Sequence, residues 1–260
     1  MTDVTASGLS VNYEVVGDGP PVVLLHGWGG CIASMGPIRE ALRTDHTVVT
    51  VDLPGFGMSE PPHDSWSTAE YGHCIGEMLL AAGFSEVLCV VGHSFGGKVA
   101  VQLALEGTVR VNSLILAGTP GARLPLSEET KRSIARVKRG KKLARMLPGP
   151  LRRSIEARYA KLGSEDYRNA SGVMRDILVK TVNEDIRDIL PGISVPTLLV
   201  FGANDTATPV EIGRIMESQI KGSGLVVMEN SGHFAYLDEP AAFNAVARSF
   251  LSSIREAGAR

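Results

Sequence analysis

Residues 87–97 read Val-Leu-Cys-Val-Val-Gly-His-Ser-Phe-Gly-Gly and carry the clearest fold signal in the chain. A short apolar run, typical of a buried strand, is followed at once by a Gly-x-Ser-x-Gly sequence centred on Ser94. A helical pattern then continues over Val99–Leu105. The order predicts a strand, a sharp turn that carries Ser94, and a helix. Glycines at positions 92 and 96 remove the side chains that would collide in such a turn.

Further apolar runs recur on both sides of this stretch, each closed by glycine or proline. Most are continuous rather than alternating, which is typical of strands covered on both faces of a parallel sheet. These runs are Val11–Val16, Val22–Leu25, Thr47–Val51, Val87–Val91, Val111–Ala117, Thr197–Phe201 and Leu225–Met228. Helical spacing lies between them, over Ser67–Ala82 with a Ser-x-x-Glu capping box, Val210–Ile220 and Pro240–Ile254. Alternating strands and helices predict an α/β fold with right-handed crossovers.

Residues 122–191 break this alternation, because their pattern is mainly helical and contains no convincing strand. Between Ala122 and Leu190 there are 17 Lys or Arg residues against 9 Asp or Glu. We therefore predict a helical module of residues 122–191 inserted into a core of residues 1–121 and 192–260. Ten basic residues and no acidic one lie between Lys131 and Arg153. One interpretation is that they attract an anionic substrate or a membrane surface. The other, which we favour, is that they form a solvated helix face beside an acidic core.

The overall composition sets broad limits on partners and location. With 44% hydrophobic and 21% charged residues, the 260-residue chain is typical of a globular protein. Its net charge of −2 does not indicate a nucleic-acid partner. We expect no signal peptide and no stable membrane insertion, since no apolar run approaches the roughly 20 residues of a spanning helix. Cys31, Cys74 and Cys89 lack metal-like spacing, which favours buried free thiols and a cytoplasmic protein; the oligomeric state stays open.

A serine nucleophile needs a base, and the base needs an orienting group. The Thr197–Phe201 run is followed by Gly-Ala-Asn and then Asp205, and the Leu225–Met228 run is followed at a short distance by Gly-His at His233. Because the carboxyl ends of parallel strands meet at one edge of a sheet, these side chains are expected to lie near Ser94. The order predicts Ser94 as nucleophile, His233 as base and Asp205 as the acid that orients it.

Each of these assignments has a rival. Asp238 is closer in sequence to His233 than Asp205 is, but it precedes Pro240, and we interpret it as a helix N-cap. The loop after Val111–Ala117 contains no carboxylate, which favours Asp205 further. His233 competes with His26 and with a structural histidine beside the nucleophile, His93, whereas three histidines are expected at the surface: His46, His63 and His73.

The loop that follows an early strand supplies the remaining expected element. Residues 24–30 read Leu-Leu-His-Gly-Trp-Gly-Gly, an apolar strand end followed by a small flexible loop. Acyl transfer develops negative charge on the carbonyl oxygen, and two backbone N–H groups stabilise such an oxyanion. We assign these donors to Trp28 and to Phe95. Only the backbone of Trp28 is required, so its ring is free to pack in the core.

With these residues in place, the chain resembles the α/β-hydrolase superfamily along nearly its whole length. The His-Gly loop at His26, residues 52–59 (Asp-Leu-Pro-Gly-Phe-Gly-Met-Ser), the elbow at Ser94, Asp205 and His233 stand in the expected order. The resemblance implies a mostly parallel eight-stranded sheet with a helical cap after the sixth strand. It also implies that residues 52–59 form a structural loop. Haloalkane dehalogenases and epoxide hydrolases carry aspartate where Ser94 stands, which argues against their chemistries.

These observations predict a serine hydrolase that cleaves carboxylic esters of small or medium acyl substrates through an acyl-enzyme. A carbon–carbon bond hydrolase acting on anionic diketone-type substrates, or a ligand-binding receptor on the same scaffold, remains an alternative, because one fold hosts many reactions. We expect no cofactor and no metal, since no phosphate loop, dinucleotide glycine pattern or metal cluster is visible. The expected partner is a small-molecule acyl substrate.

Overall fold

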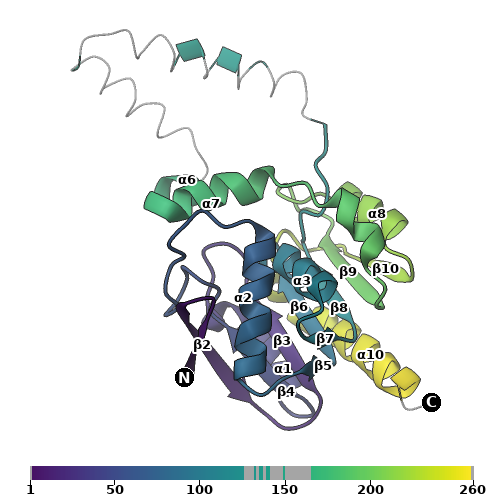
Figure 1. Ribbon diagram of the computed structural model, residues 1–260. Coiled ribbons are helices and arrows are strands. Elements are labelled where there is room, and N and C mark those ends of the chain that lie inside the picture. The colour runs from purple at the N-terminus through teal and green to yellow at the C-terminus, as the bar shows by residue number, and fades with distance from the viewer. Residues whose placement is uncertain are drawn as a thin grey trace.

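The computed structural model describes residues 2–125 and 165–258, with isolated positions 132, 135, 136, 139, 140 and 149 between these ranges. An eight-stranded sheet runs through its centre in the order β1-β2-β4-β3-β6-β8-β9-β10 (Figure 1). The β1–β2 and β2–β4 pairs are antiparallel, and the other neighbours are parallel. The strands are β1 (Thr2–Ala6), β2 (Leu9–Val16), β3 (Pro21–Leu25), β4 (Thr47–Val51), β6 (Cys89–His93), β8 (Leu114–Ala117), β9 (Thr197–Gly202) and β10 (Ser223–Met228). The predicted mostly parallel, eight-stranded α/β fold is confirmed.

The strands differ from the apolar runs in two ways. The runs at 87–91 and 111–117 each divide, because β5 (Glu86–Val87) and β7 (Arg110–Val111) pair in a separate two-stranded sheet. Leu88 N then donates to Pro21 O at 2.8 Å, which leads the chain from the small sheet into the main one. The edge strand β1 was not predicted, since its exposed polar residues lack an apolar run.

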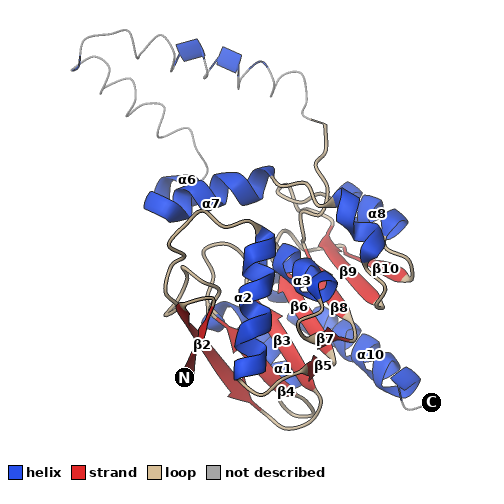
Figure 2. Cartoon of the chain, viewed as in Figure 1, coloured by secondary structure: helices blue, strands red, loops and turns tan. Residues whose placement is uncertain are grey.

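Helices cover both faces of the sheet (Figure 2). One face packs against α2 (Thr68–Ala81), α3 (Phe95–Glu106) and α8 (Val210–Gln219), and the other against α1 (Gly36–Leu42), α9 (Ala235–Asp238) and α10 (Pro240–Gly258). Strand β3 serves both cores, because alternate side chains of a strand point to opposite faces. Val23 and Leu25 join the first cluster, and Val22 and Leu24 join the second. The predicted capping box of α2 is present, with Ser67 as its N-cap and Glu70 as its partner.

Helices α6 (Glu165–Asn169) and α7 (Gly172–Asn183) and the 3-10 helix η2 (Arg187–Gly192) lie between β8 and β9 in the chain. Helix α7 crosses above the upper ends of α2 and α3 in Figure 1. Most of the basic run 131–153 lies outside the described residues, so both interpretations of it stay predictions, as do the module boundaries. Among the helices that are described, none is long and apolar enough to span a membrane.

Candidate active site

Ser94 stands in a strained turn between β6 and α3. Its backbone has φ 51° and ψ −112°, a conformation that is costly for a residue with a side chain. The two flanking glycines allow the turn to pack. A Cβ at Gly92 would lie 2.5 Å from Gly96 O, and a Cβ at Gly96 would lie 2.4 Å from Leu25 O. The tight turn places Ser94 at the carboxyl edge of the sheet, where the residue is partly exposed.

The structure brings the three predicted catalytic residues together. His233 Nε2 lies 3.0 Å from Ser94 Oγ, and His233 Nδ1 lies 2.7 Å from Asp205 Oδ2. Asp205 follows β9 and His233 follows β10, so both loops leave the sheet at the edge that carries Ser94. Because a carboxylate only accepts hydrogen bonds, His233 Nδ1 carries the proton and Nε2 presents its lone pair to the serine hydroxyl. This arrangement can remove the hydroxyl proton.

Asp205 is fixed by a second set of donors that the sequence analysis did not identify. Its Oδ1 accepts from Ala207 N at 2.8 Å and from Thr208 N at 2.9 Å, and its Oδ2 also faces Thr208 Oγ1 at 2.5 Å. Burial acts to raise the pKa of Asp205, but the hydrogen bonds from His233 and Thr208 outweigh it and hold the pKa below its usual value. Asp205 is therefore a carboxylate that cannot turn away from His233. In the sequence, the sign of these contacts is a threonine three residues after Asp205.

Asp238, the sequence rival of Asp205, has a different place from the one predicted. The N-cap interpretation is wrong, because Asp238 ends α9 and its Oδ2 accepts from Gly232 N at 2.8 Å. The next residue, Glu239, accepts from Asn230 N at 3.0 Å and from Ser231 Oγ at 2.6 Å. Both carboxylates thus brace the loop that carries His233, without contacting the imidazole.

The other histidines separate into structural and surface residues. His26 is fully buried, its Nδ1 donates to Gly27 O at 2.7 Å and its Nε2 accepts from Leu53 N at 3.0 Å. Burial lowers the pKa of His26, which favours the neutral ring, and its hydrogen bonds link two loops. His63 and His73 are exposed as predicted. The prediction for His46 is wrong, since it is only 2% exposed.

The segment 52–59 behaves as a structural loop. Asp52 is 3% exposed, and its carboxylate accepts from Ile32 N at 2.7 Å, Asn12 Nδ2 at 2.8 Å and Met58 N at 2.9 Å. Three separate segments therefore converge on one side chain. The ring of Phe56 from the same segment packs edge-on against Trp28, with 4.8 Å between ring centroids. The loop supports the residues beside Ser94.

The two predicted oxyanion donors flank the serine. Phe95 is the first residue of α3, where backbone N–H groups have no partner within the helix. Residues 27–28 run against the elbow, because a Cβ at Gly27 would lie 3.4 Å from Ser94 Cβ. Within the described residues, the Trp28 N–H has no hydrogen-bond acceptor. The Trp28 and Phe95 rings pack edge-to-face at 5.3 Å. Both residues thus lie beside Ser94, and the role of their amides as oxyanion donors stays a prediction.

Helix α7 is tied to α3, the helix that follows Ser94, by a buried lysine. Lys98 is 2% exposed, and its Nζ donates to Thr181 O at 2.9 Å and to Glu184 O at 2.6 Å. These carbonyls lie at the carboxyl end of α7, where the helix dipole favours a cation. Burial nevertheless lowers the pKa of Lys98 to about 8. The segment above the site is thereby fixed to α3.

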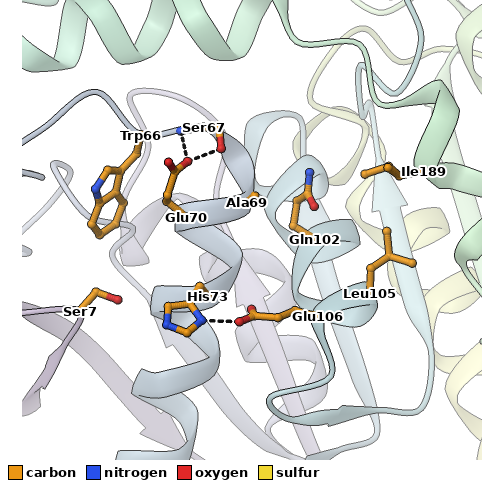
Figure 3. Close-up of a pocket in the computed structure, with 10 residues that line it drawn as sticks. All are labelled: Ser7, Trp66, Ser67, Ala69, Glu70, His73, Gln102, Leu105, Glu106 and Ile189. Carbon is orange, nitrogen blue, oxygen red and sulfur yellow. Dashed lines mark hydrogen bonds and ion pairs between the residues drawn. The ribbon is translucent and has the colours of Figure 1, made fainter.

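A groove of about 770 Å³ lies elsewhere, on the outer surface of α2 and α3 (Figure 3). Trp66, Leu105 and Ile189 form much of its apolar lining, and the paired His73 and Glu106 lie at one end. None of the three predicted catalytic residues lines it. The groove is therefore separate from the chemistry described above.

Comparison with known proteins places the chain in a family. A model described as alpha/beta hydrolase fold matches residues 20–240. A pimeloyl–acyl-carrier protein methyl ester esterase from Aeromonas hydrophila is 30% identical over 260 residues, covering 94% of this chain and 100% of that protein. The structure of an esterase from Exiguobacterium antarcticum superposes with a TM-score of 0.75 at 26% identity, over 96% of this chain and 99% of that one.

A meta-cleavage product hydrolase from Pseudomonas fluorescens has a TM-score of 0.73 at 22% identity, over 97% of this chain and 98% of that one, and supports the fold alone. The fold, the order of the motifs and the match over most of the chain agree. The chain belongs to the α/β-hydrolase fold family and is a hydrolase related to esterases.

Proposed function

We propose that this chain is a serine hydrolase that cleaves carboxylic esters of small or medium acyl groups. The observation that carries the proposal is the position of His233, within hydrogen-bond distance of both Ser94 Oγ and Asp205 Oδ2. A base held in one tautomer between a hydroxyl and a carboxylate is the arrangement that activates a serine. The esterases among the relatives support ester cleavage over the alternatives.

The reaction proceeds in two steps. His233 Nε2 takes the Ser94 proton as Oγ attacks the ester carbonyl, and the Trp28 and Phe95 N–H groups stabilise the oxyanion. The leaving alcohol takes the proton from Nε2, which leaves an acyl-enzyme. Water then gives a proton to His233 and attacks the acyl carbon, and the proton returns to Ser94 as the acid departs. Asp205 holds the imidazole and stabilises its protonated form in both steps.

Two relatives indicate which esters to test first. The Aeromonas hydrophila and Neisseria meningitidis proteins act on a methyl ester of a pimeloyl group attached to an acyl-carrier protein. A methyl ester has a small leaving group and places most of the substrate on the acyl side. We therefore include methyl esters of medium-length acids, free and carrier-bound, among the substrates to test.

The test measures hydrolysis of p-nitrophenyl esters from acetate to laurate by wild type, Ser94→Ala and Ser253→Ala. Ser253 is an exposed serine on α10 and serves as the matched control. We expect turnover in wild type and Ser253→Ala, no turnover in Ser94→Ala, and a preferred chain length that measures the acyl site. A phosphonate ester should label Ser94, as located by peptide mass. Folded wild type without ester turnover, or a label elsewhere, would contradict the proposal; cleavage of a diketone acid would then identify carbon–carbon hydrolysis.

A further inference from the structure

His93, which precedes Ser94 at the end of β6, makes a contact that the mechanism above does not use. Its Nε2 lies 2.9 Å from the backbone carbonyl oxygen of His233. A carbonyl oxygen only accepts hydrogen bonds, so His93 Nε2 carries the proton and donates it. The contact joins two segments 140 residues apart, the elbow with the nucleophile and the loop with the base.

The surroundings of His93 keep this donor in a single state. Its Nδ1 is buried and has no hydrogen-bond partner among the described residues, and it faces Gly27, where a Cβ would lie only 2.6 Å away. A second proton on Nδ1 would therefore be buried without an acceptor. Burial, followed by the nearby His233, lowers the pKa of His93 to about 4. The ring stays neutral near pH 7 and does not repel His233 when that base becomes protonated.

The ring of His93 is also fixed in orientation. It is 1% exposed and packs against His233 at 4.9 Å, Phe234 at 4.9 Å and Tyr236 at 5.1 Å between ring centroids. Buried rings in contact on several sides cannot turn without displacing their neighbours. The N–H direction is thus set by packing before it meets the His233 carbonyl.

Hydrogen bonds hold the loop around His233 at several points, and Glu239 accepts two of them. Asp205 holds the imidazole at Nδ1, Asp238 accepts from the Gly232 N–H, and His93 donates to the His233 carbonyl. Only the last of these starts from the residue bonded to the nucleophile. The chain from Ser94 through His93 to the His233 backbone, its side chain and back to Ser94 Oγ closes a ring of covalent and hydrogen bonds. A movement of either segment would strain this ring.

We propose that His93 is a positioning residue, whose Nε2–H sets the separation of the His233 imidazole from the Ser94 hydroxyl. The inference rests on the proposed role of His233 as base. A misplacement of reacting groups by about 1 Å can cost on the order of 100-fold in rate, so a single contact of this kind is large enough to matter.

Two substitutions distinguish the effect of the His93 N–H group from the effect of its ring. His93→Phe keeps a ring against Phe234 and Tyr236 but has no donor. His93→Gln lacks the ring, yet its Nε2 is the same number of bonds from Cβ as the Nε2 of histidine and can donate. We expect His93→Phe to lower kcat by about 10- to 100-fold with KM changed less than about twofold. We expect His93→Gln to recover most of this loss. His93→Met replaces His93→Phe if the latter does not fold.

His46→Phe is the control for losing a buried histidine. His46 lies just before β4, at the opposite end of the sheet from Ser94, and we expect its replacement to change stability but not kcat. A purely structural role for His93 predicts the same outcome at position 93. If Tm falls in His93→Phe while kcat does not, the positioning role is wrong.

A second readout does not depend on turnover. We expect the His233 Nδ1 proton shared with Asp205 to give a far-downfield proton resonance by NMR, and Asp205→Asn to identify it by removing it. We expect this resonance in wild type and His93→Gln, and its loss or broadening in His93→Phe. If wild type cleaves no ester, the proposed function fails while this measurement still tests the positioning. An unchanged resonance with unchanged kcat in His93→Phe, or a His93→Gln as impaired as His93→Phe, would overturn the inference.

Discussion

Replacing Asp205 by asparagine tests the electrostatic logic of the site with almost no change in shape. The Asp205 carboxylate accepts on Oδ1 from Ala207 N and Thr208 N at 2.8 and 2.9 Å, and on Oδ2 from His233 Nδ1 at 2.7 Å. An asparagine keeps the two backbone bonds only if its oxygen takes the Oδ1 position. Its NH₂ group then faces His233 Nδ1 and donates to it. The imidazole must move its proton to Nε2, which turns the base into a donor toward Ser94.

The expected loss follows from this reversal. A base in the wrong tautomer cannot accept the Ser94 proton, and the carboxylate that would stabilise the protonated ring is absent. In serine proteases this change lowers kcat by about 10⁴-fold while leaving the geometry intact, and we expect the same order here. KM should change little, since Asp205 is buried and bonded to the His233 imidazole.

The assay compares the kcat of Asp205→Asn and Asp238→Asn on the best p-nitrophenyl ester near pH 7. Asp238 is nearer in sequence to His233 but accepts from Gly232 N at an exposed position, so Asp238→Asn should cost about 1 kcal/mol of stability or less and only a few-fold in kcat. Equal losses in the two variants, or a loss below about tenfold in Asp205→Asn, would refute the assignment of the acid.

Three further outcomes are expected. Because burial lowers the pKa of Lys98 from 10.5 to about 8, the unfolded state binds more protons between these values, and the free energy of unfolding should rise with pH there. Urea titrations should find this rise missing in Lys98→Met. Gly96→Ala, whose Cβ would meet Leu25 O, should lower stability by about 1–3 kcal/mol and reduce turnover, whereas Gly36→Ala, with open space, should do neither. Asp52→Asn should lower the free energy of unfolding by about 1–3 kcal/mol, and with it Tm, because the asparagine NH₂ group would face backbone N–H donors. It should reduce kcat less than about tenfold.

The sequence was informative about the three candidate catalytic residues because each follows an apolar run and a turn. Ser94, Asp205 and His233 come after β6, β9 and β10, and parallel strands bring such positions to one edge without any knowledge of side-chain contacts. Their roles stay proposals, but their proximity could be reasoned from strand order alone.

Contacts that depend on side-chain direction could not be predicted in this way. Thr208 reaches Asp205 from the same turn, whereas the His93 donor meets an acceptor 140 residues away. Asp238 reads as an N-cap before Pro240 until the turn of α9 points its carboxylate at Gly232. No local pattern distinguishes these geometries from their alternatives.

The sequence did not predict the burial of His46, because a loop rather than a strand covers this residue. The sequence around His46, Asp-His-Thr, reads as surface, yet a Cβ at Gly17 would lie 2.3 Å from His46 O. The loop containing Gly17 closes over this position, and Arg248 of α10 binds the adjacent Asp45 at 3.0 Å. Cover of this kind comes from distant segments, and hydrophobic periodicity carries no information about it.

Several contacts of the candidate site converge on residues 94–98, at the start of α3. Ser94 precedes the helix in a strained conformation, Phe95 offers the first free N–H, and Lys98 fixes the carboxyl end of α7 from below. Helix α7 also places Met174 close to Gly55, next to Phe56, whose ring packs on Trp28. The helix therefore contacts both this loop and the turn that carries Ser94. A shift of α7 must therefore break the buried Lys98 contacts or move the start of α3.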